Sequence, residues 1–316
     1  MRIDLRDLQL FAALAQHEHF TRAAEACGIS QPALSLRINN LESTLGTQLV
    51  RRGARFAGFT EEGEILLGWA RRLLAEHDAM MGEITGGRGE VVGHVTLGVI
   101  PTALSFAARV ATAVRATHAR VVPVIRSASA GEIASGLAAG RFDIGISYVG
   151  DEAVSDIPVA GVGAAGVKEP RFLYSEGYVL VAPEPLVGAA RDTVTWAEAA
   201  ALPLALLTPD MKNRRIVDAA FREAGTSARP VFETNDLSTL YAFVADGCAA
   251  TVAPSNAPPV LVPQSGLRLR RLALQEPALS RSVAAFLPDA GFEPPAVSAV
   301  LRTAADVAAE MAAEPA

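Results

Sequence analysis

The sequence predicts an α/β protein with a small all-α domain at its N-terminus, and three observations lead to this fold class. Apolar residues recur at helical spacing from Leu5 to about Val50. A glycine-rich stretch, GEITGGRGEVVG, follows at 82–93 and predicts a flexible joint. Beyond the joint, strand-like and helical segments alternate, which predicts two α/β lobes with a ligand cleft between them.

Length and composition are those of a globular protein of two or three domains. The chain has 316 residues, of which 50% are apolar and 20% charged. No apolar run approaches the roughly 18–20 residues of a membrane span, and the N-terminus does not resemble a signal peptide. The two cysteines, Cys27 and Cys248, are too few for a disulfide framework and are interpreted as structural. We therefore expect a cytoplasmic protein with no membrane partner.

Charge is distributed unevenly along the chain. The net charge of −6 argues against a protein coated with basic residues. The first 60 residues hold seven Arg and five acidic residues, so they carry +2 and the remaining 256 carry −8. A slightly basic head on an acidic body is compatible with DNA binding by the head alone.

Two helices separated by a tight turn are predicted within 20–45. Thr21 can cap the first helix, and Gly28 lies where that helix must end, since glycine tolerates a positive φ. Ser30 can cap the second helix, and Pro32 falls in its first turn, where the missing N–H costs little. One face of the second helix is apolar and predicted to be buried, through Leu34, Ile38, Leu41 and Leu45.

The other face of that second helix carries uncharged polar groups at Ser30, Gln31, Ser35 and Asn39. Amide side chains can pair with adenine in the major groove, and Pro32 can contact a thymine methyl group. Arginines around this face are candidate phosphate contacts: Arg22, Arg37, Arg51, Arg52 and Arg55. Spacing alone leaves a second interpretation open, a helical hairpin with a solvated polar face.

A long helix is predicted after Thr60, which with Glu61 and Glu62 suits a helix start. Its apolar stripe has no predicted domain of its own to pack against. We therefore expect a second copy of the chain to cover it, with dimerisation through Leu66, Trp69 and Leu73.

The body follows a βαβαβ order and then a second strand–helix set, and polar residues stand where strands end and helices begin. The first lobe offers Thr102, Ser127, Ser129 and Tyr148, and the second offers Thr208, Met211, Asn235 and Thr251. These are the candidate ligand contacts, although the hydroxyl groups could equally be helix caps. No Arg can be placed in the cleft from the sequence, which disfavours a polyanionic ligand.

Patterns of enzyme chemistry are missing from the sequence. The five histidines show no metal-ligand spacing, and the chain has neither a phosphate-binding loop nor a nucleophile elbow. We predict no catalytic residues, no metal site and no cofactor other than a small-molecule ligand of unknown identity.

The phrases LQLFAALAQHEHFTRAAEACGISQPALSLRINNLESTLGTQLVRR and FTEEGEILL resemble the winged helix–turn–helix head of LysR-type transcriptional regulators. The resemblance covers the chain: residues 1–60 as the DNA-binding domain, 61–89 as linker helix and hinge, and 90–316 as the effector domain. It implies a two-lobed, periplasmic-binding-protein-like (type 2) body, with lobe I at about 90–165 and 264–316 and lobe II at about 166–263.

Carried over by position, the resemblance implies DNA contacts from the head, namely Thr21, Ser30, Gln31, Pro32, Ser35 and Arg37, with a wing that begins at Arg51 and Arg52. It implies a ligand-responsive regulator that binds an inverted repeat in double-stranded DNA, forms homodimers or homotetramers, and has RNA polymerase as a further partner. The alternatives are a solute-binding protein or enzyme built on the same lobes, and a purely architectural DNA-binding protein.

Overall fold

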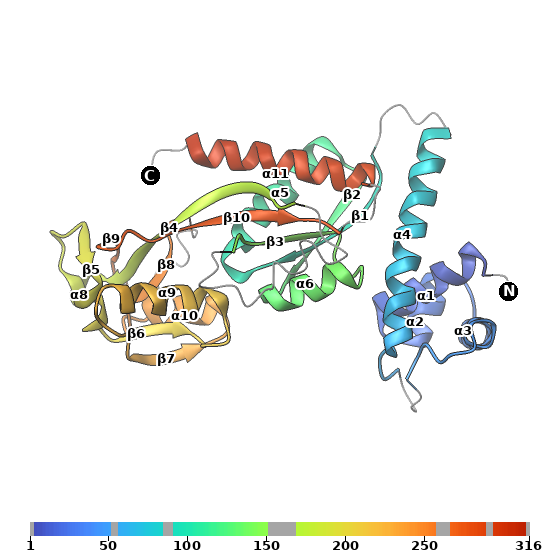
Figure 1. Cartoon of the computed structure of the whole chain (residues 1–316), viewed down its shortest axis with the longest axis horizontal. Helices are drawn as coiled ribbons and strands as arrows, with labels where there is room; N and C mark the ends of the chain where they lie inside the picture. Colours follow the sequence, from blue (N-terminus) through green and yellow to red (C-terminus); the bar gives the residue numbers. More distant parts are fainter. Residues whose placement is uncertain are drawn as a thin grey trace.

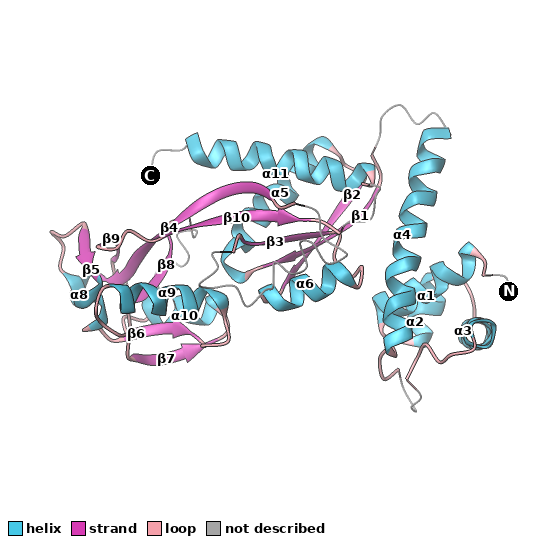
Figure 2. Cartoon of the chain, viewed as in Figure 1, coloured by secondary structure: helices cyan, strands magenta, loops and turns pink. Residues whose placement is uncertain are grey.

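The computed structural model describes residues 3–51, 56–84, 91–150, 169–256, 266–288 and 293–313. Figure 1 shows a helical head, one long helix and an elongated two-lobed body. Helices alone build the head, whereas the body combines strands and helices (Figure 2). The predicted α/β class with an all-α N-terminal domain is therefore confirmed. No described helix is both long and apolar enough to cross a membrane.

The head packs three helices around one apolar core. They are α1 (Leu5–His17), α2 (Phe20–Ala26) and α3 (Gln31–Leu45). The predicted stripe on α3 is buried at Leu34, Ile38 and Leu41. A single antiparallel bridge joins Val50 to Phe59 where the wing was expected. Phe59 also packs edge-on against Phe11 of α1, with ring centroids 4.9 Å apart, so the chain after the bridge is held to the same core.

The long helix α4 (Glu61–Ile84) begins as predicted, because the Thr60 hydroxyl accepts a hydrogen bond from the Gly63 N–H at 3.1 Å. We expected no part of the same chain to cover the apolar stripe of this helix, and that expectation was wrong in part. α4 lies against α1, and Leu67 and Ala70 are buried there. Ile65, Trp69 and Leu73 remain exposed. One side of the helix is thus packed within the chain and another side faces outward.

Lobe I begins with the predicted βαβαβ unit. Its elements are β1 (Gly93–Val99), η1 (Pro101–Ala103), α5 (Leu104–Thr117), β2 (Val121–Ser127), α6 (Ala130–Ala138) and β3 (Ile144–Tyr148). β1 pairs in parallel with both β2 and β3, as expected. The chain returns to this lobe at its C-terminal end through β10 (Ser280–Phe286), antiparallel to β3, and α11 (Pro295–Ala313), which packs on α5. This antiparallel return was not predicted.

Lobe II holds the second strand–helix set. Its elements are α7 (Glu184–Val187), β5 (Thr193–Thr195), α8 (Trp196–Ala200), β6 (Leu204–Leu207), α9 (Lys212–Glu223), β7 (Pro230–Thr234), α10 (Leu237–Ala245), β8 (Thr251–Pro254) and β9 (Leu269–Gln275). β6 and β7 form a separate parallel pair. The predicted helices at 214–224 and 237–247 are present as α9 and α10.

One strand, β4 (Arg171–Pro183), belongs to both lobes. Its residues 171–177 pair with β10 of lobe I, whereas residues 178–183 pair with β8 or β9 of lobe II. The strand order β2-β1-β3-β10-β4-β9-β5 is therefore continuous through the molecule. The pairing changes between Gly177 and Tyr178, and the chain returns to lobe I between β9 and β10. Both transitions come later than the expected boundaries at 166 and 264.

The long helix also contacts lobe I directly. Gly68 of α4 lies so close to the end of α6 that an added Cβ would be 2.5 Å from the Ala139 carbonyl oxygen. Gly140 has a φ of 65° and meets Gly68 from the other side. The Arg71 Nη1 donates to the Gly140 carbonyl at 3.2 Å, and burial lowers the pKa of Arg71. The helix α4 thus packs on lobe I with its backbone in direct contact with the backbone of lobe I.

Candidate functional sites

The first candidate site is the exposed end of α3 in the head. Ser30 caps this helix by accepting from the Ala33 N–H, Pro32 stands in its first turn, and Gly28 has a φ of 68°, all as predicted. The side chains of Gln31, Pro32 and Asn39 are exposed, and Ser35 is half-buried. The Gln31 Nε2 donates to the Ser35 Oγ at 2.9 Å, so these two polar groups are already aligned on the helix surface.

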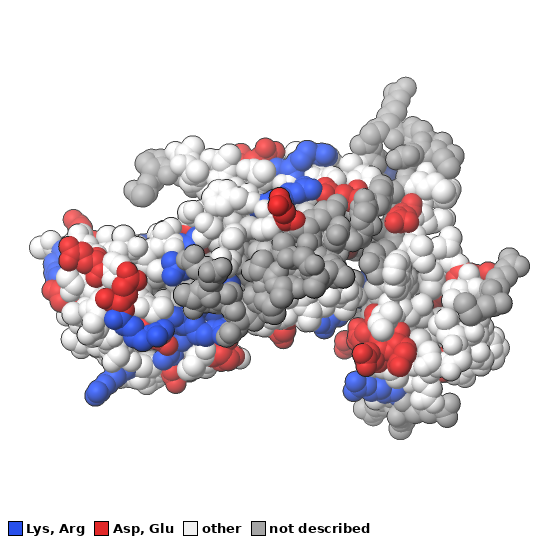
Figure 3. All heavy atoms as spheres, in the orientation of Figure 1, with Lys and Arg blue, Asp and Glu red and all other residues white. Residues whose placement is uncertain are grey.

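Other residues expected in this site have different roles. Thr21 is exposed but does not cap α2; His19 is the cap, and its Nδ1 accepts from the Thr21 N–H. Arg37 forms an ion pair of 2.9 Å with Asp7 of α1. Arg22 and Arg51 are exposed, whereas Arg52 and Arg55 lie outside the described residues. In Figure 3 the visible face of the head carries both acidic and basic groups rather than a continuous basic surface.

The expected dimerisation residues differ in exposure. Leu66 is half-buried and packs against the apolar core of the head. Trp69 and Leu73 are 54% and 43% exposed, and Ile65, at 57%, adds to the outward surface that they form. The outward surface of α4 is therefore built mainly by Ile65, Trp69 and Leu73.

The second candidate site is a buried hydrogen-bonded cluster that joins the two lobes. The Tyr148 hydroxyl, at the end of β3, lies 2.8 Å from the Thr102 hydroxyl of η1 and donates to Glu176 Oε1 of β4 at 2.6 Å. The Tyr178 hydroxyl is 3.2 Å from that of Tyr148. Asn213 of α9 donates from Nδ2 to both tyrosine hydroxyls, at 3.3 and 3.1 Å. Four elements of the two lobes, η1, β3, β4 and α9, thus meet around the Tyr148 hydroxyl.

Burial dominates the electrostatics of this cluster. It raises the pKa of Glu176 to about 7, although the hydrogen bonds from Tyr148 and Tyr178 act in the opposite direction. Burial likewise raises the pKa of Tyr148 and Tyr178 well above the ordinary value. The Lys212 Nζ lies 5.9 Å from the centroid of the Tyr148 ring. Burial, then Arg215 and Arg281, lower the pKa of Lys212.

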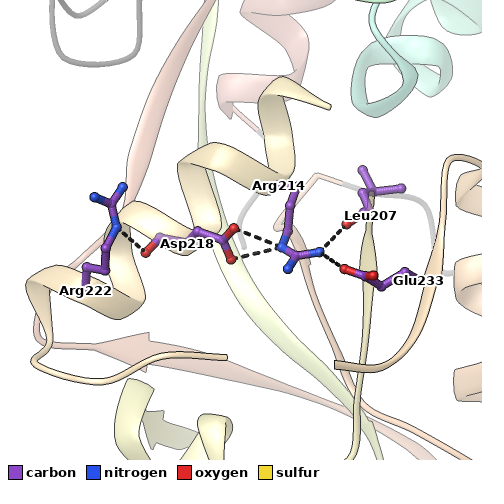
Figure 4. Close-up of polar contacts among 5 residues, drawn as sticks. All are labelled: Leu207, Arg214, Asp218, Arg222 and Glu233. Atoms are coloured by element: carbon purple, nitrogen blue, oxygen red, sulfur yellow. Dashed lines mark hydrogen bonds and ion pairs between the residues drawn. The ribbon is translucent and has the colours of Figure 1, made fainter. Parts of the chain in front are cut away.

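Arg214 fixes the helix that supplies Lys212 and Asn213 (Figure 4). Its Nη1 donates to the Leu207 carbonyl at 2.7 Å and to Glu233 Oε1 at 2.6 Å, which ties α9 to β6 and β7. Its Nε donates to both oxygens of Asp218, one turn further along α9. Because Arg214 is 8% exposed, these charge-assisted bonds hold the start of α9 in one position.

Two of the eight expected ligand contacts, Thr102 and Tyr148, lie in the cluster. Thr208 follows β6 with its hydroxyl buried and without a partner, and Met211 is the residue before α9. Ser129 caps α6 in a capping box with Glu132, as the alternative interpretation allowed. Of the remaining three, Ser127 and Asn235 are exposed, and Thr251 pairs with Val181 at the start of β8 with its hydroxyl buried and without a partner.

The sequence interpretation missed Glu176, Tyr178, Lys212, Asn213 and Arg281. One signal could have found the first two, because Tyr174, Glu176 and Tyr178 alternate along one strand and so share a face. No Arg could be placed in the cleft from the sequence, whereas in the structure Arg281 acts electrostatically on both Tyr178 and Lys212. Among the described residues, no group of three or more His, Cys, Asp or Glu could hold a metal ion.

Comparison with known families gives two matches that together span most of the chain. Residues 5–64 match the model described as "Bacterial regulatory helix-turn-helix protein, lysR family". Residues 88–309 match the "LysR substrate binding domain". Similar proteins include a "Probable hydrogen peroxide-inducible genes activator" of Streptomyces viridosporus, 32% identical over 89% of this chain and 86% of that one. The "DNA-binding transcriptional dual regulator OxyR" of Escherichia coli K12 is 30% identical over 81% of each chain.

Solved structures share the fold over nearly the whole length. Full-length OxyR of Pseudomonas aeruginosa, as a cysteine variant, superimposes with a TM-score of 0.71 at 22% identity and covers 97% of both chains. CbnR in complex with its target DNA gives a TM-score of 0.63 at 19% identity, covering 96% of this chain and all of that one.

Proposed function

Because this chain belongs to the LysR family of transcriptional regulators, we propose that the end of α3 contacts the operator and that the interlobe cluster binds the effector. The chain is a ligand-responsive, DNA-binding regulator and not an enzyme. The observation that carries the proposal is the hydrogen-bonded cluster that joins Thr102 and Tyr148 of lobe I to Asn213 of lobe II. A ligand bound there would alter how the lobes meet.

For the head, we propose that Gln31, Pro32, Ser35 and Asn39 face the bases, with Thr21 and Ser30 beside them. The exposure of Gln31, Pro32 and Asn39, and the hydrogen bond that aligns the half-buried Ser35 with Gln31, support this assignment. Arg22, Arg51 and Arg52 are the proposed phosphate contacts. Arg37 is a further proposed DNA contact. It would have to break its 2.9 Å ion pair with Asp7 before it could bind a phosphate.

For assembly, we propose that the outward surface of α4 pairs with the same surface of a second chain. Such pairing would cover Trp69 and Leu73, whose exposed apolar area favours burial. Two heads held in this way suit an inverted repeat in double-stranded DNA. The cytoplasm is the proposed location, since the DNA lies there, and RNA polymerase is a proposed further partner.

One of the similar proteins is named as a probable activator of hydrogen peroxide-inducible genes. The chain has two cysteines, Cys27 in the head and Cys248 after α10. A disulfide switch within the effector domain needs two thiols, and that domain contains one. We therefore propose a small molecule, and not a thiol oxidation within the lobes, as the signal.

The proposed effector site is tested by replacing Thr102 with Val, which preserves shape and deletes the hydrogen bond to Tyr148. We expect Thr102→Val to reduce the response of an operator-linked reporter to the inducing condition by at least about tenfold in sensitivity. Operator binding without effector should persist in a gel-shift assay, because the head is a separate core. Thr112→Val, an exposed change on α5, is the matched control. An unaltered response in Thr102→Val would remove the cluster from the effector site.

A further inference from the structure

Two groups of opposite charge lie side by side in the interlobe cluster without pairing. Glu176 on β4 and Arg281 on β10 are direct partners in the antiparallel register. Side chains at such positions project from the same face of the sheet, with Cβ atoms about 5 Å apart. No ion pair joins the two residues in the described structure. Each instead keeps a buried atom that has no hydrogen-bond partner, Oε2 of Glu176 and Nε of Arg281.

The groups around Glu176 leave its second oxygen without a donor. Tyr148 of β3 and Tyr178 of β4 both donate to Oε1, at 2.6 and 3.4 Å. Tyr174 of β4 and Tyr241 of α10 lie within its electrostatic influence, and both hydroxyls are buried, that of Tyr174 beside Asn256. All four tyrosines of the chain therefore surround this one carboxyl group.

Lys212 lies among cationic groups. Arg281 and Arg215 both lower the pKa of Lys212, and no acidic residue offsets them there. The ammonium of Lys212 has only the Tyr148 ring as a described contact, and Lys212 is 9% exposed. The cluster thus holds an acidic end at Glu176 and a basic end formed by Arg281 and Lys212.

A ligand with one charge would suit only one of these ends. A simple carboxylate would pair with Arg281 and lie beside the negative Glu176, whereas a simple amine would pair with Glu176 and lie beside two cations. A molecule that carries an ammonium and a carboxylate on the same carbon atom would satisfy both ends at once. The two charges must lie close together because Glu176 and Arg281 are adjacent across two strands.

We propose that the effector is an α-amino acid or a similar small zwitterion, whose ammonium donates to Glu176 and whose carboxylate accepts from Arg281 and Lys212. This assignment rests on the proposed function of the cluster as the effector site. Tyr148, Tyr178 and Asn213 close the cluster from both lobes, so the lobes must part for the ligand to enter. The bound zwitterion then replaces interlobe contacts with its own, which couples binding to lobe position.

The test uses the purified full-length protein and the twenty protein α-amino acids, each added at millimolar concentration in a thermal unfolding assay. The amino acid that raises Tm most is then studied by calorimetry. We expect Glu176→Gln and Arg281→Gln each to weaken its binding by about tenfold or more. Glu223→Gln, exposed at the end of α9, and Arg171→Gln, exposed on β4, are controls of equal charge change and should bind normally.

Wild-type protein alone provides a second arm, which is informative even if Glu176→Gln fails to fold. The decarboxylated amine and the deaminated carboxylate of the same amino acid should each bind at least about tenfold more weakly than the parent. Affinity for the amino acid should increase from about pH 6 to about pH 8, because Glu176 accepts from an ammonium only when it is ionised.

Three results would overturn the proposal: no amino acid binds, the deaminated carboxylate binds as well as the parent, or Glu176→Gln binds normally. Normal binding by Glu176→Gln would mean that Glu176 does not contact the ligand and that its charge partner is Arg281. These failures are separable from failure of the proposed effector site. If the reporter response still depends on Thr102 while no amino acid binds, the site stands and only the ligand class is wrong.

Discussion

At Glu176, burial and hydrogen bonding act on one carboxyl group in opposite directions, and burial prevails. The side chain is 1% exposed, and its pKa of about 7 lies well above the ordinary 4.5. The folded protein therefore binds a proton at this residue over a range of pH in which the unfolded chain has already released it. Folding and protonation are linked at this position.

This linkage gives a prediction for stability. The stabilising contribution of protonated Glu176 is complete below about pH 4.5 and is lost as the pH rises through about 7. Over that window the free energy of unfolding of wild type, relative to Glu176→Gln, should fall by about 3 kcal/mol. Urea unfolding of both proteins at a series of pH values measures it. Glu223→Gln should track wild type, and parallel curves for wild type and Glu176→Gln would contradict the linkage.

Gln31 and Ser35 lie together on the exposed surface of α3 and are expected to act together in base recognition. Their mutual hydrogen bond of 2.9 Å holds the Gln31 amide in place, so loss of either partner should reduce base discrimination. We expect Gln31→Ala and Ser35→Ala each to reduce the preference for operator over random DNA by about 1–3 kcal/mol. Competition gel shifts measure this ratio, with the exposed Gln16→Ala on α1 as control. Retained preference in both variants would show that α3 is oriented differently.

Single residues were predictable where the chemistry is local. Thr102 and Tyr148 were identified because each stands next to a strand end, which the sequence reveals. Glu176 and Arg281 were missed because their meeting depends on β10 returning antiparallel beside β4, some hundred residues later in the chain. No local pattern encodes that register.

At the scale of elements, caps and turns explain where the helices of the head begin and end. Ser30, Gly28 and Thr60 act as their residue types predict, since each satisfies or ends a helix through its own side chain or backbone. Thr21 does not, because His19 caps α2 two residues earlier. The sequence did not predict β5, which has three residues, or α11, which lies in alanine-rich sequence, and no local pattern marked β9 or β10.

The outward surface of α4 is the proposed contact between two chains. Leu73 is 43% exposed on its outward surface, so Leu73→Glu should place a carboxylate in the proposed seam between two chains. We expect monomers, or an aggregating protein, where wild type forms dimers or larger species. Multi-angle light scattering determines the mass. Ala305→Glu, on an exposed position of α11, should leave the mass unaltered, and an equally unaltered mass for Leu73→Glu would refute the seam.

At the scale of the whole molecule, a net charge of −6 must coexist with binding to a polyanion. Lys and Arg atoms gather on lobe II in the face shown in Figure 3, far from the head in that view. Attraction to DNA must therefore come from a few arginines of the head, and the acidic residues elsewhere work against prolonged non-specific contact.

The salt dependence of operator binding tests this distribution. Each phosphate contact contributes a slope of about −0.9 to the plot of log affinity against log salt concentration. Arg22→Ala should make the slope shallower by about one and weaken operator and random DNA alike. Fluorescence anisotropy with labelled operator measures both effects. Arg302→Ala, exposed on α11, removes the same charge and should leave the slope as in wild type.

The close contact between Gly68 and Gly140 fixes the long helix α4 to lobe I. With backbone against backbone and no side chain between them, α4 takes its direction from lobe I. Lobe II is joined to lobe I through β4, the strand that the two lobes share. We therefore expect a ligand that moves α9 to turn lobe II at Gly177, where β4 changes partner, while α4 stays with lobe I. In the proposed dimer, the angle between the two α4 helices would then set the distance between the two heads.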